Sequence, residues 1–170
     1  MGSKFEGLYA NAHDYFCQIW LSVTQKTLDN LDGESKILGR LMLEHPEYQH
    51  LWTKPYSYAE IDLERLMRQG EASPHIHLAI EATVLNQVEA KNPPEAARAY
   101  KALQTAGVEK SEARHVLGRV LAGVAWEISH KDMEIGPGYE NLYLRRLKRV
   151  AKNPLSVVRE QTEQLANRLL

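Results

Sequence analysis

Proline and glycine interrupt a helical spacing of apolar residues at short intervals along the chain, and this pattern constrains the fold more than any other feature. Apolar residues recur with helical spacing from Phe5 to Val23, whereas strand-like alternation is nearly absent. Proline suits the first turn of a helix and ends a preceding one, as we expect at Pro46, Pro94 and Pro154. The sequence therefore predicts an all-α fold.

The same punctuation predicts the helix boundaries and the domain organisation. Pro55, Tyr56 and Tyr58 indicate a loop in the segment 53–72, where Trp52 and the two tyrosines line a pocket or cover the core. Short loops and the absence of repeats or a linker predict one domain over 1–170, a bundle of about seven to eight helices. The expected longer helices cover residues 5–23, 37–45, 74–91, 95–105, 111–129, 139–152 and 154–170, with short helices over 47–52 and around Leu63 and Met67.

The composition excludes several classes of protein. A formal net charge of −1 over 170 residues gives no overall field that would attract nucleic acid or an anionic membrane. One cysteine, Cys17, forms neither an internal disulfide nor a thiolate metal site, and no apolar run reaches membrane-spanning length. We therefore expect a cytoplasmic protein, whose partners are another protein or a second copy of the chain rather than a membrane or nucleic acid.

A histidine and a glutamate lie on the apolar face of the helix that begins at Ser73. At about 100° per residue, His77 and Glu81 share a stripe with Val84 and Val88. A buried carboxylate is unfavourable unless a hydrogen bond, a cation or a metal compensates it. The pattern therefore predicts a partner for Glu81, which the sequence itself does not identify.

The helix over 111–129 supplies further candidates. It is apolar or small on nearly all sides, which is typical of a central helix, and His115 lies on its small-residue side with Gly118 and Ala122. Histidine and carboxylate ligands one turn apart are how helical bundles build metal sites. We therefore expect His77, Glu81 and His115, with Glu127 as a weaker fourth ligand, to hold zinc, iron or manganese. If the site is catalytic, a metal-activated water with a carboxylate base is the expected chemistry.

Structural interpretations of these residues remain open. A buried His–Glu pair is often only a satisfied hydrogen bond, here with Arg119 or a tyrosine hydroxyl as a third member. His45 precedes Pro46 and is interpreted as a surface histidine at a helix start, where Glu47 favours the positive end of the helix dipole. Cys17 follows His13 by one turn, but a buried, inert cysteine is the commoner case.

The C-terminal part of the chain is basic. Residues 139–170 contain seven Lys or Arg against three Glu, a balance of +4, which leaves −5 for the remainder. Arg145, Arg149 and Lys152 share one helix face and could bind an acidic partner or nucleic acid as a non-catalytic interaction module. A solvated face, docked on an acidic body, explains them equally well.

Several short motifs occur along the first 130 residues, namely His45-Pro46-Glu47-Tyr48, Pro74, His77, Gln87, His115 and Trp126-Glu127. Together they resemble an uncharacterised bacterial family, domain of unknown function 1841. The resemblance covers most of residues 5–130, so 139–170 is expected to be a helical extension. It implies a functional site at His77 and Glu81 but no activity, because the family has none established.

The sequence departs from the family pattern at three positions. Glu81 stands where the family places a second histidine, and Arg119 and Gly123 replace acidic residues of the later helix. Glutamate in place of histidine keeps the capacity to bind a metal. The loss of the later acidic residues leaves fewer anionic ligands.

Overall fold

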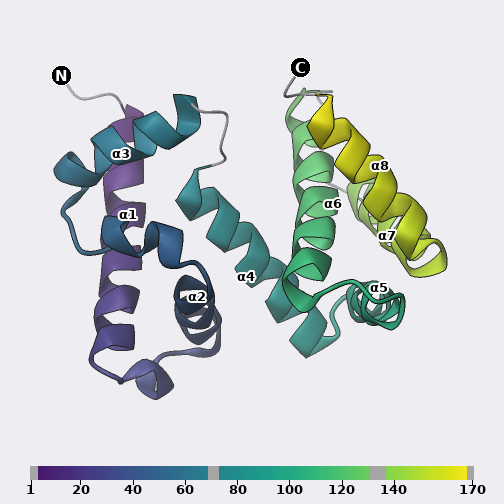
Figure 1. The fold of residues 1–170 in the computed structure, drawn as a ribbon, viewed down its shortest axis with the longest axis horizontal. Coiled ribbons are helices and arrows are strands. Elements are labelled where there is room, and N and C mark those ends of the chain that lie inside the picture. Colours follow the sequence, from purple (N-terminus) through teal and green to yellow (C-terminus); the bar gives the residue numbers. More distant parts are fainter. Residues whose placement is uncertain (1–3, 69–72, 131–136, 168–170) are drawn as a thin grey trace. The chain divides into compact units, whose positions relative to one another are not determined.

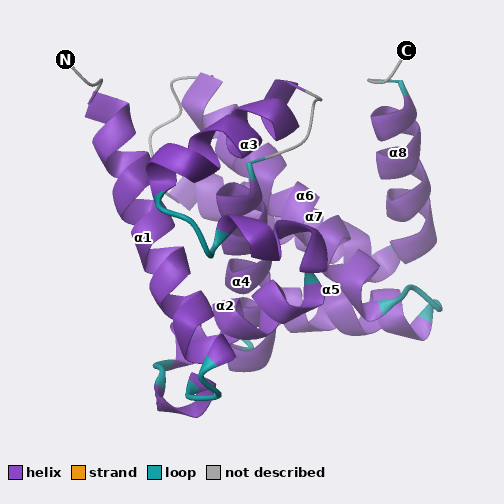
Figure 2. Cartoon of the chain, turned by 60° about the vertical axis from the view of Figure 1, so that its left-hand side comes forward, coloured by secondary structure: helices purple, strands orange, loops and turns teal. Residues whose placement is uncertain are grey.

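The computed structural model describes residues 4–68, 73–130 and 137–167, and within these segments it contains helices and no strand (Figures 1 and 2). The all-α prediction is therefore confirmed. The chain divides into two compact units, Met1–Ala82 and Thr83–Leu170, and helix α4 runs through the boundary between them. We describe each unit by itself.

The first unit is built from three helices, two short 3-10 helices and the beginning of α4. Helix α1 packs against α2 and α3. Helix α2 begins at Gly33 because the side chain of Asp32 accepts a hydrogen bond from the Ser35 amide at 2.8 Å, which is a standard N-cap. The elements are α1 (Lys4–Thr24), η1 (Leu28–Asn30), α2 (Gly33–Glu44), η2 (Pro46–Leu51), α3 (Tyr56–Arg68) and α4 (Pro74–Ala90).

Large apolar side chains fill the core of this unit. Gly39 of α2 makes a close approach possible, because an added Cβ would lie 3.2 Å from Val23 Cγ2 and would collide with Leu28 Cδ1. Trp52, which the sequence placed either at a pocket or over the core, is 2% exposed, whereas Tyr58 is 70% exposed. Other core residues of the unit are Phe16, Ile19, Leu38, Leu41, Met42, Leu51 and Leu63.

The second unit packs α5 (Pro94–Thr105), α6 (Lys110–His130), α7 (Pro137–Lys152) and α8 (Pro154–Ala166) around one apolar cluster. Each of these four helices contacts the other three. Gly107 ends α5 with φ 87°; its N–H bonds to the Gln104 carbonyl, and the Val108 N–H bonds to the Leu103 carbonyl. This is a Schellman motif, and it explains why glycine stands there.

One predicted segment differs from the structure. In the segment 53–72, the loop expected before the short helix with Leu63 and Met67 is shorter than predicted, because α3 already begins at Tyr56, with the Pro55 carbonyl accepting bonds from the amides of Tyr58 and Ala59. Gly70, which is expected to end this helix, and Gly136, which is expected to belong to a break in the chain, lie outside the described residues. None of the described helices has the length and apolar content that a membrane span requires.

Candidate metal site

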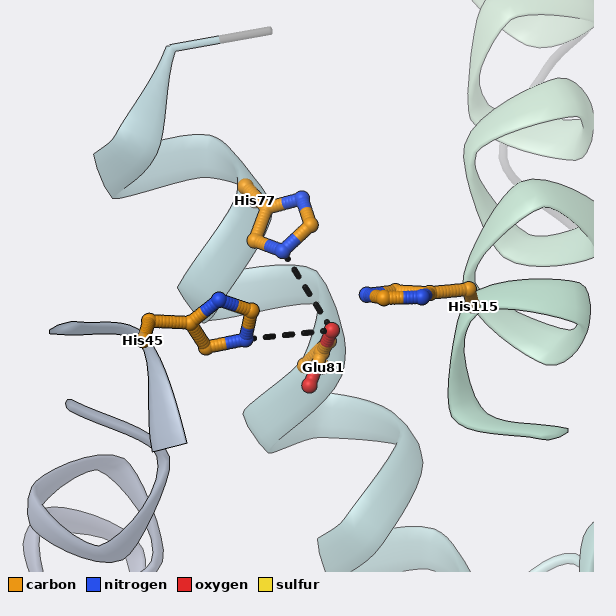
Figure 3. Close-up of side chains that lie close together, drawn as sticks. All are labelled: His45, His77, Glu81 and His115. Carbon is orange, nitrogen blue, oxygen red and sulfur yellow. Dashed lines mark ion pairs between the residues drawn. The ribbon is translucent and has the colours of Figure 1, made fainter. Parts of the chain in front are cut away.

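Helix α4 carries His77 and Glu81 on consecutive turns of the same face. His77 Nε2 lies 3.3 Å from Glu81 Oε1, as Figure 3 shows. Glu81 is only 1% exposed, whereas the His77 side chain is 24% exposed. The structure thus places a carboxylate in the interior with an imidazole beside it, the arrangement that the helical spacing predicts.

A second histidine reaches the same carboxylate from the end of α2. His45 Nε2 lies 3.6 Å from Glu81 Oε1 (Figure 3), and His45 is 9% exposed. The interpretation of His45 as a surface histidine is therefore wrong. It is the residue directly after α2, and the turn into η2 directs its ring inward.

The spacing of these three side chains suits one metal ion. One ligand atom each from His45, His77 and Glu81 can be chosen so that all lie within 4.8 Å of one another. The two nitrogen–oxygen distances, 3.3 and 3.6 Å, exceed the usual N–H···O separation. Two ligands that are each about 2.1 Å from a tetrahedral zinc ion lie about 3.4 Å apart, which is close to both values.

Glu47 orients His45 for such a role. The Nδ1 atom of His45 lies 2.8 Å from Glu47 Oε1, so Nδ1–H donates to the carboxylate and the lone pair of Nε2 faces Glu81. The pKa of His45 is raised, first by the Glu81 carboxylate close to Nε2 and then by Glu47, against the effect of burial. Burial is the largest single effect on Glu47 and acts to raise its pKa, but the hydrogen bond from His45, a backbone hydrogen bond and the charges of His45 and His77 together make the net shift of the pKa downward.

Ring contacts hold both imidazoles in place. The Tyr48 ring stacks on His45 with centroids 5.6 Å apart and meets His77 edge-on at 5.9 Å. The two imidazoles are themselves edge-to-face at 4.9 Å. Packed rings of this kind restrict the rotamers of both ligands, which is what a preorganised metal site requires.

The other two predicted ligands belong to α6 in the second unit. His115, which Figure 3 also labels, has its Nδ1 atom 3.7 Å from Glu112 Oε2. Glu127 pairs with Arg146. His115 and Glu127 are twelve residues apart on one helix, about 18 Å along its axis, so a single ion cannot bind both. Arg119, considered as a partner for the His–Glu pair, bonds to Glu112 and Gln161.

Comparison with known protein families identifies the family of this chain. The family model described as "Domain of unknown function (DUF1841)" matches residues 9–149. The chain belongs to this family. His45, Glu47, His77 and Glu81 all lie inside the DUF1841 region, as does His115. No curated protein and no solved structure matches the chain.

The DUF1841 region also includes two of the three residues predicted to bind a partner. Arg145 and Arg149 lie within it and Lys152 just beyond it, and all three are exposed on α7. Arg149 already pairs with Glu160 of α8, its Nη2 atom lying 2.6 Å from both carboxylate oxygens. The role of this face in partner binding remains a prediction.

A second histidine pair anchors the start of α4 in the first unit. His13 Nε2 donates to the Lys54 carbonyl at 2.8 Å, and His13 Nδ1 lies 3.1 Å from His75 Nε2. Burial, with His13 as a smaller cause, lowers the pKa of His75 to about 4, so this imidazole is uncharged at neutral pH. The pair ties α4 to α1 two residues before His77.

Burial also raises the pKa of the Cys17 thiol, which agrees with an inert cysteine.

Proposed function

We propose that His45, His77 and Glu81 bind one divalent transition-metal ion. The supporting observation is the spacing of their ligand atoms, which lie about as far apart as neighbouring ligands of a tetrahedral ion. Glu81 is almost fully buried, and a metal would compensate the desolvation of its charge. A hydrogen-bonded pair without a metal would need neither the second imidazole nor the carboxylate that orients it.

The ligand types favour zinc, iron(II) or manganese. Two imidazole nitrogens and one carboxylate oxygen suit these ions, whereas calcium and magnesium prefer oxygen ligands alone. At equal availability zinc binds tightest of the three. Without a fourth protein ligand, the three leave a coordination position for water or a substrate oxygen, as in catalytic zinc sites. The chemistry supplied there would be activation of that water, with a carboxylate as base.

His115 stays in this proposal as a fourth ligand. Its imidazole and its place on the small-residue side of α6 are the reasons for including it. Glu127 is left out, since it is too far along α6 to share an ion with His115. A fourth protein ligand would make the site a closed, structural one if the ion is four-coordinate.

The test is metal content by plasma mass spectrometry on tag-free protein purified without chelator, followed by a zinc titration. We expect close to one ion per chain, lost in His77→Ala and in Glu81→Gln. His50→Ala is the matched control, because His50 is a half-exposed histidine of η2 next to the site. Absence of metal from the purified protein and from the titration would refute the proposal, as would equal loss in the control.

The His115→Ala variant tests the fourth ligand separately. If His115 binds the ion, its loss weakens zinc binding by at least about tenfold, as for other ligand or outer-shell replacements. An unchanged affinity in His115→Ala, beside the loss in His77→Ala, would restrict the site to the three residues of the first unit.

A further inference from the structure

The second unit contains a cavity of about 650 Å³ between α6, α7 and α8. Its apolar floor includes Val120, Val150 and Val157, one from each helix, and all three are nearly fully buried. Ala122 and Gly123 of α6 also line it, and their small side chains leave the space open. The volume lies in the range of pockets that bind drug-sized molecules.

Cationic groups predominate among the charged residues that line this cavity. Arg119 of α6 and Arg146 and Arg149 of α7 face it together with two carboxylates, Glu127 and Glu160, which leaves one positive charge in excess. Gly123 lets a guanidinium lie against α6, because an added Cβ would be 3.3 Å from Arg146 Nη1. That excess charge is met outside the lining by Glu112, which pairs with Arg119. The cavity therefore combines an apolar floor with a wall of arginines that are each paired with a carboxylate.

Arg149 can exchange its partner, Glu160, with little loss of stability. The Arg149 and Glu160 side chains are 59% and 41% exposed, and an ion pair that is this accessible to water contributes little stability. An anion in the cavity could therefore take the place of Glu160 on Arg149. Arginine suits this exchange, since its planar guanidinium binds carboxylate, sulfonate and phosphate groups with two parallel hydrogen bonds.

The open side of the cavity presents an aromatic ring. Trp126 lines the cavity and is 58% exposed, and Leu165 beside it in the lining is 44% exposed. The indole stacks on His130 with centroids 4.3 Å apart and planes at 18°, so its orientation is fixed. A rigid, exposed indole is a favourable surface for stacking another flat ring.

We propose that this cavity binds a small amphiphilic anion, namely an aromatic body that carries one acidic group. The acidic group pairs with Arg149, and with Arg146 beside it, while the aromatic body lies on the valine floor and against Trp126. This inference is independent of the proposed metal site, because none of its residues belongs to that site.

A titration with 1-anilinonaphthalene-8-sulfonate, an aromatic body with one sulfonate, tests the proposal by the rise in dye fluorescence. We expect saturable binding to one site per chain. Arg149→Ala and Trp126→Ala should each weaken binding about tenfold, through the loss of a charge-assisted hydrogen bond or of ring contact. Arg145→Ala is the control, since Arg145 is exposed on the same helix but does not line the cavity.

A change of opposite sign makes the test sharper. Glu160→Gln removes the competing partner of Arg149, so it should tighten dye binding several-fold. Glu163→Gln changes the net charge equally, on the same helix and outside the cavity lining, and should leave the affinity unchanged. Circular dichroism and thermal melts confirm that each variant is folded, which is expected because the altered side chains are largely exposed.

The proposal fails if the dye does not bind or binds without saturation. It also fails if Arg149→Ala and Trp126→Ala bind the dye as well as the wild type. Equal weakening by Arg145→Ala would show that the dye responds only to surface charge, and equal tightening by Glu163→Gln would show the same. Weakening by the two cavity variants together with tightening by Glu160→Gln would support it.

Discussion

Replacing Glu47 with alanine removes the carboxylate that orients His45 but leaves all proposed metal ligands in the sequence. In the structure, Glu47 accepts the Nδ1–H bond of His45 at 2.8 Å and so directs Nε2 toward Glu81. Without this carboxylate, the His45 imidazole can rotate or adopt the other tautomer. It also lacks a neighbouring negative charge, which would make it a stronger ligand. We therefore expect weaker zinc binding in a protein that remains folded.

The size of the effect follows from the geometry. Outer-shell replacements at metal sites weaken binding by about 10- to 100-fold, or roughly 1.4 to 2.7 kcal/mol. The Glu47 side chain is 54% exposed, so water screens its charge and favours the lower end, about tenfold. Glu47→Gln keeps an oxygen that can accept the bond but loses the charge, and it should show a smaller loss.

The assay is a competitive zinc titration against a chelating dye at constant pH, with Glu64→Gln as a control. Glu64 also carries an exposed carboxylate on the first unit, where it pairs with Arg68. A zinc affinity unchanged in Glu47→Ala, in a wild type that does bind zinc, would refute the proposed orienting role. The same loss in Glu64→Gln would attribute the effect to overall charge.

Three further predictions concern stability. Gly107→Ala should lower the free energy of unfolding by about 1 kcal/mol, because φ is positive at Gly107. Gly33→Ala should not lower it, because Gly33 has open space around it and an ordinary φ. Urea titrations that show equal effects of the two substitutions would contradict this prediction. His75→Phe leaves His13 Nδ1 without its partner and should cost about 1–3 kcal/mol, so an unchanged thermal midpoint would argue against the bond. The hydrogen bond from Lys54 is the largest cause that lowers the pKa of Asp62. The stability from this depressed pKa is present above about pH 4 and is lost as the pH falls through the folded-state pKa, so wild type and Asp62→Asn should differ near pH 7 and converge near pH 2.

The fold could be predicted from the sequence wherever a local signal marks a helix end. Pro74, Pro94 and Pro154 each begin a helix, because proline fixes φ at a helical value, and Gly107 follows one, because glycine tolerates the positive φ found there. The segment after Trp52 was predicted less well. Tyr56 and Tyr58 were interpreted as loop residues, but α3 begins at Tyr56 and the Pro55 carbonyl accepts its first bonds, which the turn-like local composition does not reveal.

The candidate site could likewise be predicted only in part. His77 and Glu81 could be predicted because both lie on one helix, where spacing alone fixes their relation. His45 and Glu47 are separated from them by thirty residues or more, so only the tertiary packing of the first unit brings them together. The one sequence signal for both was the His45–Tyr48 motif, one of those on which the resemblance to the DUF1841 family was based.

The central claim, that one ion is bound by His45, His77 and Glu81, is tested most directly by X-ray absorption at the zinc edge. The sample is protein loaded with one equivalent of zinc, compared with His45→Ala and His77→Ala loaded in the same way. We predict nitrogen and oxygen ligands at about 2.0–2.1 Å, with at least two imidazoles in the wild type and one fewer in each variant. A spectrum of water ligands alone, or an imidazole count unchanged in both variants, would contradict the claim.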